Sequence, residues 1–357
     1  MKMRFNTLLF FGVFLALVLA SCQEQKVKSS TTTHLFRNVP ITESNLNFRN
    51  TVQENENFNF INYMYIYNGG GVAIGDVNND GWPDVFMGSN QGADKLYINK
   101  KKMRFEDKSL EMGIPEERHW TTGVSMVDIN NDGWLDIYVC RSASPDPNKR
   151  ANKLYINNSG ESFTEESAAY GLDDQAYSTQ AYFFDYDKDN DLDMFLVNHR
   201  ADFNNVIIYT PEIARTRSPF SSDKLYRNDG GRFTDVSSEA GIENNCWGLS
   251  ASIGDFNEDG WLDIYVCNDF IQGDHMWINN QRGGFTDKIL ETFDHTSFFS
   301  MGSDIADINN DLRPDMIVLD MVSEDHVSNK RNMAGMSTEQ FFRLVNLEYN
   351  YQYMNNM

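Results

Sequence analysis

The chain repeats one acidic nine-residue pattern five times, and this repetition constrains its fold more than any other feature. The pattern reads Asp-x-Asn-x-Asp-Gly-x-x-Asp in its commonest form. The first aspartates of successive copies are 52, 57, 70 and 52 residues apart. A period of this length is typical of arrays in which each repeat is one supersecondary unit. The copies span residues 76–84, 128–136, 185–193, 255–263 and 307–315.

Short runs of strand-like composition flank each copy. An apolar run such as 71–75 precedes the acidic pattern, and a β-branched or aromatic run such as 85–87 follows it. Two further elements come next, of which Lys-Leu-Tyr-Ile-Asn at 95–99 and Phe-Glu-Asp at 105–107 are the first examples. Their lengths and compositions indicate four strands per repeat. We therefore expect an all-β fold, a β-propeller of four-stranded antiparallel blades, with about five blades present.

The side chains within each acidic copy predict a calcium site. Numbered from the first aspartate, positions 1, 3, 5 and 9 always carry Asp or Asn. Oxygens at 1, 3 and 5 converge on one point, and Gly or Asn at position 6 permits a left-handed turn. That turn brings the carbonyl of position 7 and the carboxylate of position 9 onto the same ion. Hard oxygen donors without His or Cys select Ca²⁺, with Mg²⁺ or Mn²⁺ behind it. The candidate ligands are Asp76, Asn78, Asp80, Trp82, Asp84, Asp128, Asn130, Asp132, Trp134, Asp136, Asp185, Asp187, Asp189, Asp191, Asp193, Asp255, Asn257, Asp259, Trp261, Asp263, Asp307, Asn309, Asp311, Arg313 and Asp315.

Two alternatives to this calcium interpretation have to be weighed. An EF-hand opens in the same way but needs a Glu at position 12 and helices on both sides. Position 12 is apolar in all five copies, so the EF-hand interpretation fails. The second alternative is that the copies are acidic turns that bind no metal. In the fifth copy Leu312 occupies position 6, where a positive φ is costly for leucine. We therefore expect four or five bound Ca²⁺ ions. The position-12 residues are Met87, Val139, Leu196, Val266 and Val318.

The net charge is partly a consequence of these loops. The formal charge is −22, and the five copies hold 18 of the 52 acidic residues. Five bound Ca²⁺ ions would reduce the charge to about −12. A field of this sign repels phosphate backbones, so we expect no nucleic-acid partner.

The N-terminus is typical of an export signal. Lys2 and Arg4 precede an apolar run at 8–20, which is too short to span a bilayer. The run ends in Leu-Ala-Ser-Cys at Cys22, which resembles a bacterial lipobox. We expect residues 1–21 to be a lipoprotein signal peptide, Cys22 to be lipidated, and 22–34 to be a flexible tether. The protein would then be exported and lipid-anchored to the outer membrane or cell surface. A general secretion signal with an incidental cysteine is the alternative.

The acidic loop and its flanking strands resemble the FG-GAP/VCBS repeat family, which includes the calcium-binding blades of integrin α-subunit propellers. The added Leu-Tyr-Ile-Asn and Phe-Thr-Asp elements look most like the cartilage-acidic-protein (ASPIC/UnbV) group. The resemblance covers roughly residues 35 to 325. It implies a propeller, Ca²⁺ at the matched loop positions, extracellular binding or adhesion, and no catalytic residues.

The domain boundaries follow from these features. We expect propeller blades over 35–330 and the start of an unfinished blade over 331–357, because residues 352–356 look like a third-strand element. Five blades are fewer than members of the family usually close with, so the propeller is expected to be incomplete in this chain. A different closure or completion by oligomerisation is the alternative.

The loops between second and third strands indicate a recognition surface. Antiparallel strands place them on the face opposite the acidic loops, and their lengths vary strongly, which is typical of binding loops. They span 88–94, 141–152 and 199–223. We expect this surface to be lined by Arg141, His199, Arg200, Tyr209 and Asp269.

The favoured function is a non-catalytic surface module that binds a glycan or a protein. An enzyme or accessory subunit of a polysaccharide-processing or uptake complex is one alternative, and a display scaffold for a C-terminal domain is another. The six histidines show no spacing that suggests a catalytic site, and no Gly-x-Ser-x-Gly, His-Glu-x-x-His or phosphate-loop motif occurs. Cys140 and Cys267 occupy the same place in two repeats, where each is interpreted as a small apolar residue at the end of a buried strand.

Overall fold

The computed structural model describes residues 36–202, 211–323, 325, 327–328, 338–347, 349, 351–354 and 357. The chain forms two compact units, Met1–Pro40 and Ile41–Met357. The predicted signal peptide, Cys22, the tether and Tyr209 lie outside the described residues. Within the described part of the chain, no helix has the length and apolar character needed to cross a membrane.

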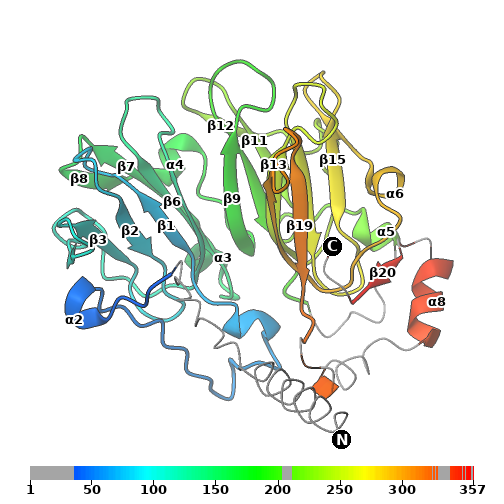
Figure 1. Ribbon diagram of the computed structural model, residues 1–357, viewed down its shortest axis with the longest axis horizontal. Coiled ribbons are helices and arrows are strands. Elements are labelled where there is room, and N and C mark those ends of the chain that lie inside the picture. The colour runs from blue at the N-terminus through cyan, green and yellow to red at the C-terminus, as the bar shows by residue number, and fades with distance from the viewer. Residues whose placement is uncertain are drawn as a thin grey trace, which may run out of the picture. The chain divides into compact units, whose positions relative to one another are not determined.

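Four four-stranded antiparallel sheets form the larger part of the second unit, which confirms the predicted all-β fold. In each sheet the strands pair in chain order, so each acidic copy connects a first strand to a second strand. Figure 1 shows these blades in chain order, from the blue strands to the yellow ones. The blades are β1 (Val72–Gly75), β2 (Asp84–Met87), β3 (Lys95–Asn99) and β4 (Phe105–Asp107); β5 (Thr121–Val127), β6 (Asp136–Arg141), β7 (Lys153–Asn158) and β8 (Ser162–Glu165); β9 (Ser178–Phe184), β10 (Asp193–Asn198), β11 (Lys224–Asn228) and β12 (Phe233–Asp235); and β13 (Gly248–Gly254), β14 (Asp263–Asn268), β15 (His275–Asn279) and β16 (Phe285–Asp287).

The fifth repeat forms a smaller sheet. β18 (Ser300–Ala306) and β19 (Asp315–Asp320) pair antiparallel, and the first strands of successive repeats lie side by side up to β18. The segment predicted to resemble a third strand lies elsewhere, because β20 (Gln352–Tyr353) pairs in parallel with β17 (Thr296–Ser297). The backbone of Met357 instead exchanges two hydrogen bonds with Val318 of β19. Ile317 and Leu319 of β19 are exposed, unlike their counterparts in the buried second strands of the other blades.

Short helices connect or follow the blades. η1 precedes β1, and α8 is the longest described helix. The helices are α2 (Ile41–Ser44), η1 (Met64–Tyr67), α3 (Pro147–Arg150), α4 (Ser167–Tyr170), α5 (Pro211–Ala214), α6 (Ile289–Thr292) and α8 (Thr338–Asn346).

The cores lie between neighbouring blades. Because side chains of a strand alternate in direction, Ile137 and Val139 of β6 pack against the first blade while Tyr138 and Cys140 pack against the third. Close approach of the inner strands requires glycine at Gly123, where an added Cβ would lie 2.3 Å from the carbonyl oxygen of Thr179. Cys140, Cys246 and Cys267 are free and buried, and Cys140 and Cys267 belong to these inter-blade cores.

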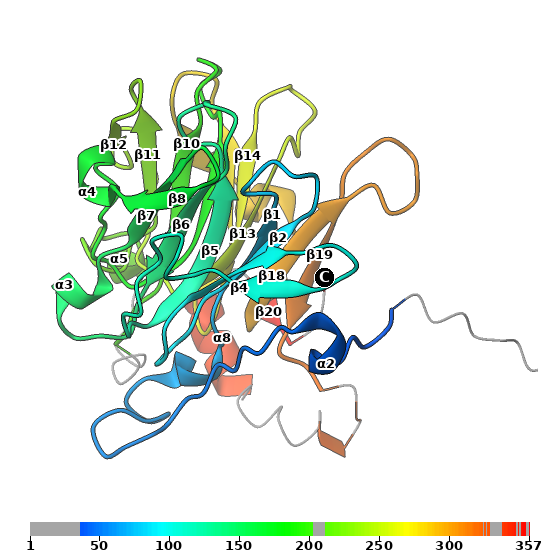
Figure 2. The ribbon, with the colours of Figure 1, turned by 90° about the vertical axis from the view of Figure 1, so that its left-hand side faces the viewer.

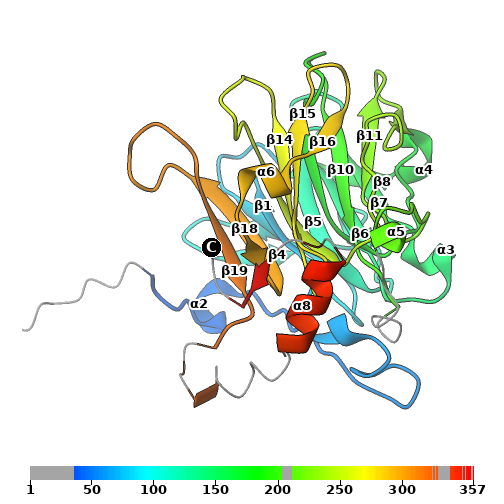
Figure 3. The ribbon, with the colours of Figure 1, turned by 90° about the vertical axis from the view of Figure 1, so that its right-hand side faces the viewer.

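The two ends of the blades carry different structures. The acidic loops join first to second strands and therefore share one end. The segment that leads into β1 and the connections between second and third strands share the other end. Figures 2 and 3 show η1 and α8 together at that second end, and Leu344 of α8 packs in the same apolar cluster as Tyr65 and Ile66. We call this second end the η1 face.

Candidate metal loops and a ligand-binding face

All five acidic loops share one hydrogen-bonded geometry. The carboxylate at position 1 accepts the N–H of position 6, over distances from 2.6 Å at Gly81 to 3.1 Å at Asn190. The carboxylate at position 5 accepts the N–H of position 7 in the same way. These bonds fix the carboxylates of positions 1 and 5 against the loop backbone. The fifth loop has the same geometry although Leu312 replaces glycine.

The position-9 aspartates have a second role that the sequence pattern did not indicate. In the second blade, the buried carboxylate of Asp136 accepts the N–H of Ile129 at 3.1 Å and that of Asn157 at 2.7 Å. It thereby ties the loop to the third strand. Burial raises the pKa of this carboxyl to about 6, and Asp132 and Asp128 add like-charge repulsion. The same contacts recur at Asp84, Asp193 and Asp263.

The asparagine that ends each Leu-Tyr-Ile-Asn element completes this link. The side-chain amide of Asn157 donates to the carbonyl oxygens of Leu135, in its own loop, and of Val77, in the preceding loop. Asn279 makes the equivalent pair with Leu262 and Tyr186. Asn157 and Asn279 therefore each connect two successive acidic loops, whereas Asn99 and Asn228 donate to a carbonyl oxygen of their own loop.

Backbone conformation explains which residues the loops tolerate. Position 6 has a positive φ in every loop, as predicted, and Leu312 adopts 71° while 94% exposed. Position 4 also has a positive φ in every loop, which the sequence analysis missed; the residues are Asn79, Asn131, Lys188, Glu258 and Asn310. Two left-handed residues in nine make the turn tight enough to bring the acidic side chains together.

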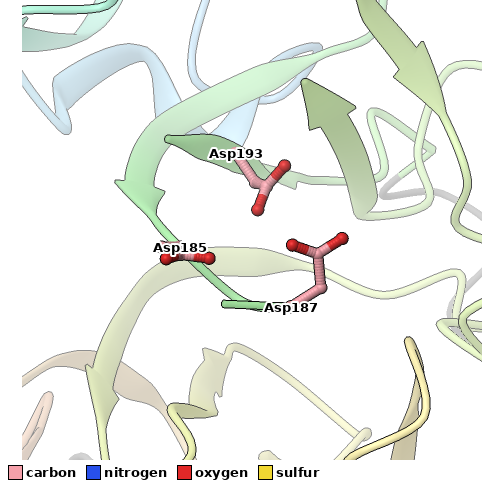
Figure 4. A group of neighbouring side chains, drawn as sticks. All are labelled: Asp185, Asp187 and Asp193. Carbon is pink, nitrogen blue, oxygen red and sulfur yellow. The ribbon is translucent and has the colours of Figure 1, made fainter. Parts of the chain in front are cut away.

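The third loop is the most acidic and gives the best test of whether the residues fit a cation. Oxygens of Asp185, Asp187 and Asp193 all lie within 4.8 Å of one another, as Figure 4 shows. Buried oxygens of Asp187 and Asp191 have no hydrogen-bond partner among the described residues. Burial and the neighbouring carboxylates raise the pKa of Asp187, and burial raises that of Asp193 to about 7. Three converging carboxylates, one of which keeps an unpaired oxygen at Asp187, fit Ca²⁺.

Neighbouring loops contact one another along this end of the blades. The side chain of Asn79 donates to the carbonyl oxygen of Gly133 at 3.0 Å. The ammonium of Lys188 lies 4.3 Å from the ring centre of Trp261. Arg313 pairs with Glu258 at 3.1 Å. Position 4 of one loop thus meets position 6 or 7 of the next loop in these three pairs.

The η1 face brings together two of the five residues predicted to line a recognition surface. His199 and Asp269 both contact Tyr65, whose ring lies 4.9 Å from the imidazole and whose hydroxyl donates to the Asp269 carboxylate at 3.3 Å. Arg141 is buried at the end of β6, and Arg200 lies over Trp247 and pairs with Asp202; neither lines the pockets described below.

The first of two pockets on this face, the inner-strand pocket, measures about 510 Å³. Hydroxyl and amide side chains from successive first strands form one wall, namely Thr122, Thr179, Gln180 and Ser250. Aromatic rings form another wall, namely Tyr63, Tyr65, Tyr67, Trp120 and Tyr182. No Asp, Glu, Lys or Arg lines this pocket in the described structure.

His199, which also lines the inner-strand pocket, is neutral. Burial lowers the pKa of His199 to about 4. Its Nδ1 donates to the carbonyl oxygen of Arg200 at 2.8 Å, and its Nε2 lies 2.9 Å from the Ser142 hydroxyl. Since a carbonyl oxygen only accepts, Nδ1 carries the proton and Nε2 accepts from Ser142.

The second pocket, the Asp269 pocket, shares Tyr65, Tyr67, Asn68 and Met301 with the first and measures about 500 Å³. Apolar side chains dominate its walls, and Asp269 is the acidic residue among them. Burial raises the pKa of Asp269 to about 6.

The aromatic segment before β1 is the part of this face that sequence reasoning missed. Residues 58–67 read Phe-Asn-Phe-Ile-Asn-Tyr-Met-Tyr-Ile-Tyr and lie outside the repeats. Five aromatic residues at nearly alternate positions were a usable signal, because such density in a polar neighbourhood indicates a buried or ligand-binding surface.

Two nucleophilic side chains contact histidines, and both are buried. The Cys246 sulfur lies 3.4 Å from Nε2 of His275, whose Nδ1 lies 2.6 Å from Asp287. Burial raises the pKa of the Cys246 thiol, which opposes thiolate formation. His275 and Asp287 occupy the places of Lys95 and Asp107, which form an ion pair in the first blade. The Cys246 group is therefore explained as a variant of a structural cross-strand pair.

Comparison with known proteins agrees with the repeat structure. A family model described as an FG-GAP-like repeat matches residues 76–139, 210–266 and 255–318. Cartilage acidic protein 1 of Xenopus tropicalis is 22% identical over 250 residues, which cover 67% of this chain and 35% of that protein. Cartilage acidic protein 1 of Mus musculus is 22% identical over 244 residues, with the same coverage. The chain thus spans about a third of the length of these relatives.

Two solved structures that match part of this chain have TM-scores below 0.5. One is an Agrocybe aegerita lectin described as recognising non-reducing terminal N-acetylglucosamine, with a TM-score of 0.41 and 18% identity over 70% of this chain and 60% of that chain. The other is the V. cholerae biofilm matrix protein Bap1, with a TM-score of 0.33 and 15% identity over 71% of this chain and 35% of that chain.

Proposed function

Because this chain carries FG-GAP-like repeats, we propose that it is a calcium-loaded, non-catalytic binding module that takes a neutral glycan in the inner-strand pocket. The calcium ions would hold the acidic loops at one end of the blades. The glycan would bind at the opposite end, on the η1 face. The metal would therefore support the scaffold without touching the ligand.

The composition of the inner-strand pocket carries the glycan proposal. Sugars present apolar C–H faces that stack on aromatic rings, and hydroxyls that both donate and accept hydrogen bonds. Tyr67 offers an exposed ring at the rim. The Thr179 hydroxyl and the Gln180 amide already donate to backbone carbonyl oxygens, so these two side chains offer their oxygens as acceptors in the wall. The absence of Asp, Glu, Lys and Arg from the described lining favours an uncharged ligand, since a charged one would lack a partner there.

The donor chemistry of the loops supports the calcium proposal. Five loops offer Asp and Asn oxygens in one shared geometry, and the third loop holds carboxylate oxygens without hydrogen-bond partners among the described residues. When bound, Ca²⁺ would neutralise the repulsion between these carboxylates. The proposed ligands are the loop residues at positions 1, 3, 5, 7 and 9.

A non-catalytic role agrees with the environment of the candidate nucleophiles. Ser142 is fully buried beside His199, and Cys246 is buried with a raised pKa. Neither lines the inner-strand pocket.

Export and lipid anchoring through Cys22 belong to the same proposal. The apolar run at 8–20 and the Leu-Ala-Ser-Cys sequence support it. The test is fractionation of cells that produce the full chain. The wild type should partition with membranes, and Cys22→Ser should not; equal membrane partitioning of both would contradict the anchor.

The glycan proposal is tested on an array of neutral oligosaccharides, with labelled protein in calcium. We expect selective binding that Tyr67→Ala reduces at least tenfold, because the exposed ring is lost from the pocket rim. Ile61→Ala is the matched control, since Ile61 is exposed in the same segment and does not line the pocket. No bound sugar, or equal loss with both variants, would contradict the proposal.

A further inference from the structure

The Asp269 pocket has different chemistry from the inner-strand pocket beside it. Its walls are formed largely by aromatic rings and thioethers, including Phe60, Phe298, Phe299 and Met321. Its volume of about 500 Å³ suits a small organic molecule. Few groups in these walls can pair with several hydroxyls, so the pocket favours a ligand with an apolar body.

Asp269 places a carboxylate in these walls without a basic partner. Its side chain is 4% exposed, and its oxygens accept the N–H of Phe270 at 2.8 Å and the Tyr65 hydroxyl at 3.3 Å. A carboxylate has about four lone-pair sites, so acceptor capacity is left. No Lys, Arg or His among the described residues forms an ion pair with it, and the charged group whose field reaches it is another acid, Asp320.

An ionised carboxylate in apolar surroundings is costly unless a cation accompanies it. A cationic ligand would remove that cost. The surrounding rings would add to its binding, because the faces of aromatic rings attract cations. An anionic ligand would be repelled by Asp269 and Asp320 together.

The backbone at this place is strained in a way that fits a binding site. Phe270 has a φ of 64°, a conformation unfavourable for a bulky residue. Its ring lies 5.5 Å from that of Trp247 and 6.4 Å from that of Phe299. The ring of Tyr65 lies 6.3 Å away, so Phe270 completes an aromatic wall next to the carboxylate.

We propose that the Asp269 pocket binds a small organic ammonium ion with an apolar body. Asp269 pairs with the ammonium group, and the aromatic wall encloses the apolar part. The binding does not require a glycan in the neighbouring pocket, so failure of either proposal leaves the other standing.

The test is calorimetric titration of the full chain in calcium with two probes of equal shape. 2-Phenylethylammonium carries the charge, and 2-phenylethanol is its neutral counterpart. We expect the ammonium to bind at least tenfold more tightly than the alcohol, as a buried charge pair would produce. Equal affinities, or no binding of the ammonium, would overturn the proposal.

Variants assign the discrimination to Asp269. Asp269→Asn keeps an acceptor for Tyr65 and is expected to remove the tenfold preference while leaving the affinity for the alcohol unchanged. Asp229→Asn is the matched control, because it removes an exposed carboxylate that pairs with Arg227 far from the pocket walls. If Asp229→Asn also lost the preference for the ammonium over the alcohol, that preference would be an effect of net charge. This result would overturn its assignment to Asp269.

A second variant tests the pocket independently in case Asp269→Asn does not fold. Phe299→Leu keeps the charge and removes one ring of the wall. It is expected to weaken binding of the ammonium more than binding of the alcohol, because the ring attracts the cation. Equal weakening of both probes would mean that the rings contribute only apolar contact and would contradict this part of the proposal.

Discussion

The hydroxyl of Tyr65 donates a hydrogen bond to the carboxylate of Asp269 across 204 residues of chain. Tyr65 precedes the first blade, and Asp269 follows the second strand of the fourth. The η1 face is therefore assembled from a segment outside the repeats and from connections within them. The hydrogen bond lies at the boundary between the two pockets.

Tyr65→Phe is expected to lower the free energy of unfolding by about 1 kcal/mol, because it removes a partner of a buried carboxylate. Tyr67→Phe is the control, since that ring is 64% exposed and its hydroxyl contributes little to folding. Urea denaturation of both variants measures the difference. Equal stability of the two variants would contradict the structural importance of the Tyr65–Asp269 bond.

Substitutions at two of the three aspartates of the second loop, Asp136 and Asp132, are expected to separate the effect of metal binding from that of folding. Asp136→Asn should destabilise the protein by about 2–3 kcal/mol in calcium and in chelator alike, because an amide cannot accept both N–H groups that Asp136 accepts. Asp132→Asn keeps the acceptor for Trp134 and should mainly reduce the calcium-induced rise in melting temperature. Thermal melts with and without chelator measure both. If Asp136→Asn lowered the stability only in the presence of calcium, the structural role of Asp136 would be contradicted.

Leu312→Asn is expected to stabilise the fifth loop. A leucine at a φ of 71° costs about 1 kcal/mol more than asparagine, which tolerates the left-handed region. Leu312 is 94% exposed, so little packing is lost. The unfolding midpoint should therefore rise by the equivalent of about 0.5–1 kcal/mol. Leu312→Ala is the control, because it removes the same apolar side chain without relieving the strain of the positive φ. A gain in unfolding free energy as large as that of Leu312→Asn would refute this explanation.

The repeats made much of the fold predictable, because one pattern recurring five times specifies strands, turns and pairing order together. The left-handed turn at position 6 followed from glycine at that position. The role of Asp136 did not, because a carboxylate in a metal motif gives no sign that it also accepts one backbone N–H from its own loop and one from the third strand. The recurring asparagines were visible in the sequence, but the links that Asn157 and Asn279 make between successive loops depend on how the blades pack.

The ligand face was only partly predictable. His199 and Asp269 were identified because each directly follows a second strand, and the structure brings both to Tyr65. Arg141 was expected on the surface from its loop position, yet it is 3% exposed at the end of β6. The segment around Tyr65 lies outside the repeats, and its contacts across the chain depend on tertiary packing that no local pattern encodes.

His199 is expected to make stability depend on pH. Burial lowers its pKa to about 4, below the ordinary value near 6.5, so the folded protein binds this proton less readily than the unfolded chain. Its contribution is fully present above pH 6.5 and is lost as the pH falls through 4. His199→Asn keeps a donor for Arg200 and should reduce the loss of stability between pH 6.5 and 4 by on the order of 2–3 kcal/mol.

Denaturation at several pH values measures this contribution as the difference between wild type and variant. The comparison with the variant is needed because three buried carboxyls change the stability with pH in the opposite direction. Burial raises the pKa of Asp223 and Asp269 to about 6 and that of Asp274 to about 7. These carboxyls favour the folded state below pH 4, and that contribution is lost as the pH rises through their folded values. Parallel curves for wild type and His199→Asn would contradict the assignment.

The central claim is that the acidic loops bind calcium and that this binding supports the blades. The direct measurement is a calcium titration by calorimetry on the metal-free chain, combined with its thermal midpoint in excess calcium and in excess chelator. We predict four or five ions per chain and a higher midpoint in calcium, with each site adding about 2.7 kcal/mol when free calcium is 100 times its Kd. No bound calcium, or a midpoint that is the same in excess chelator, would contradict the claim.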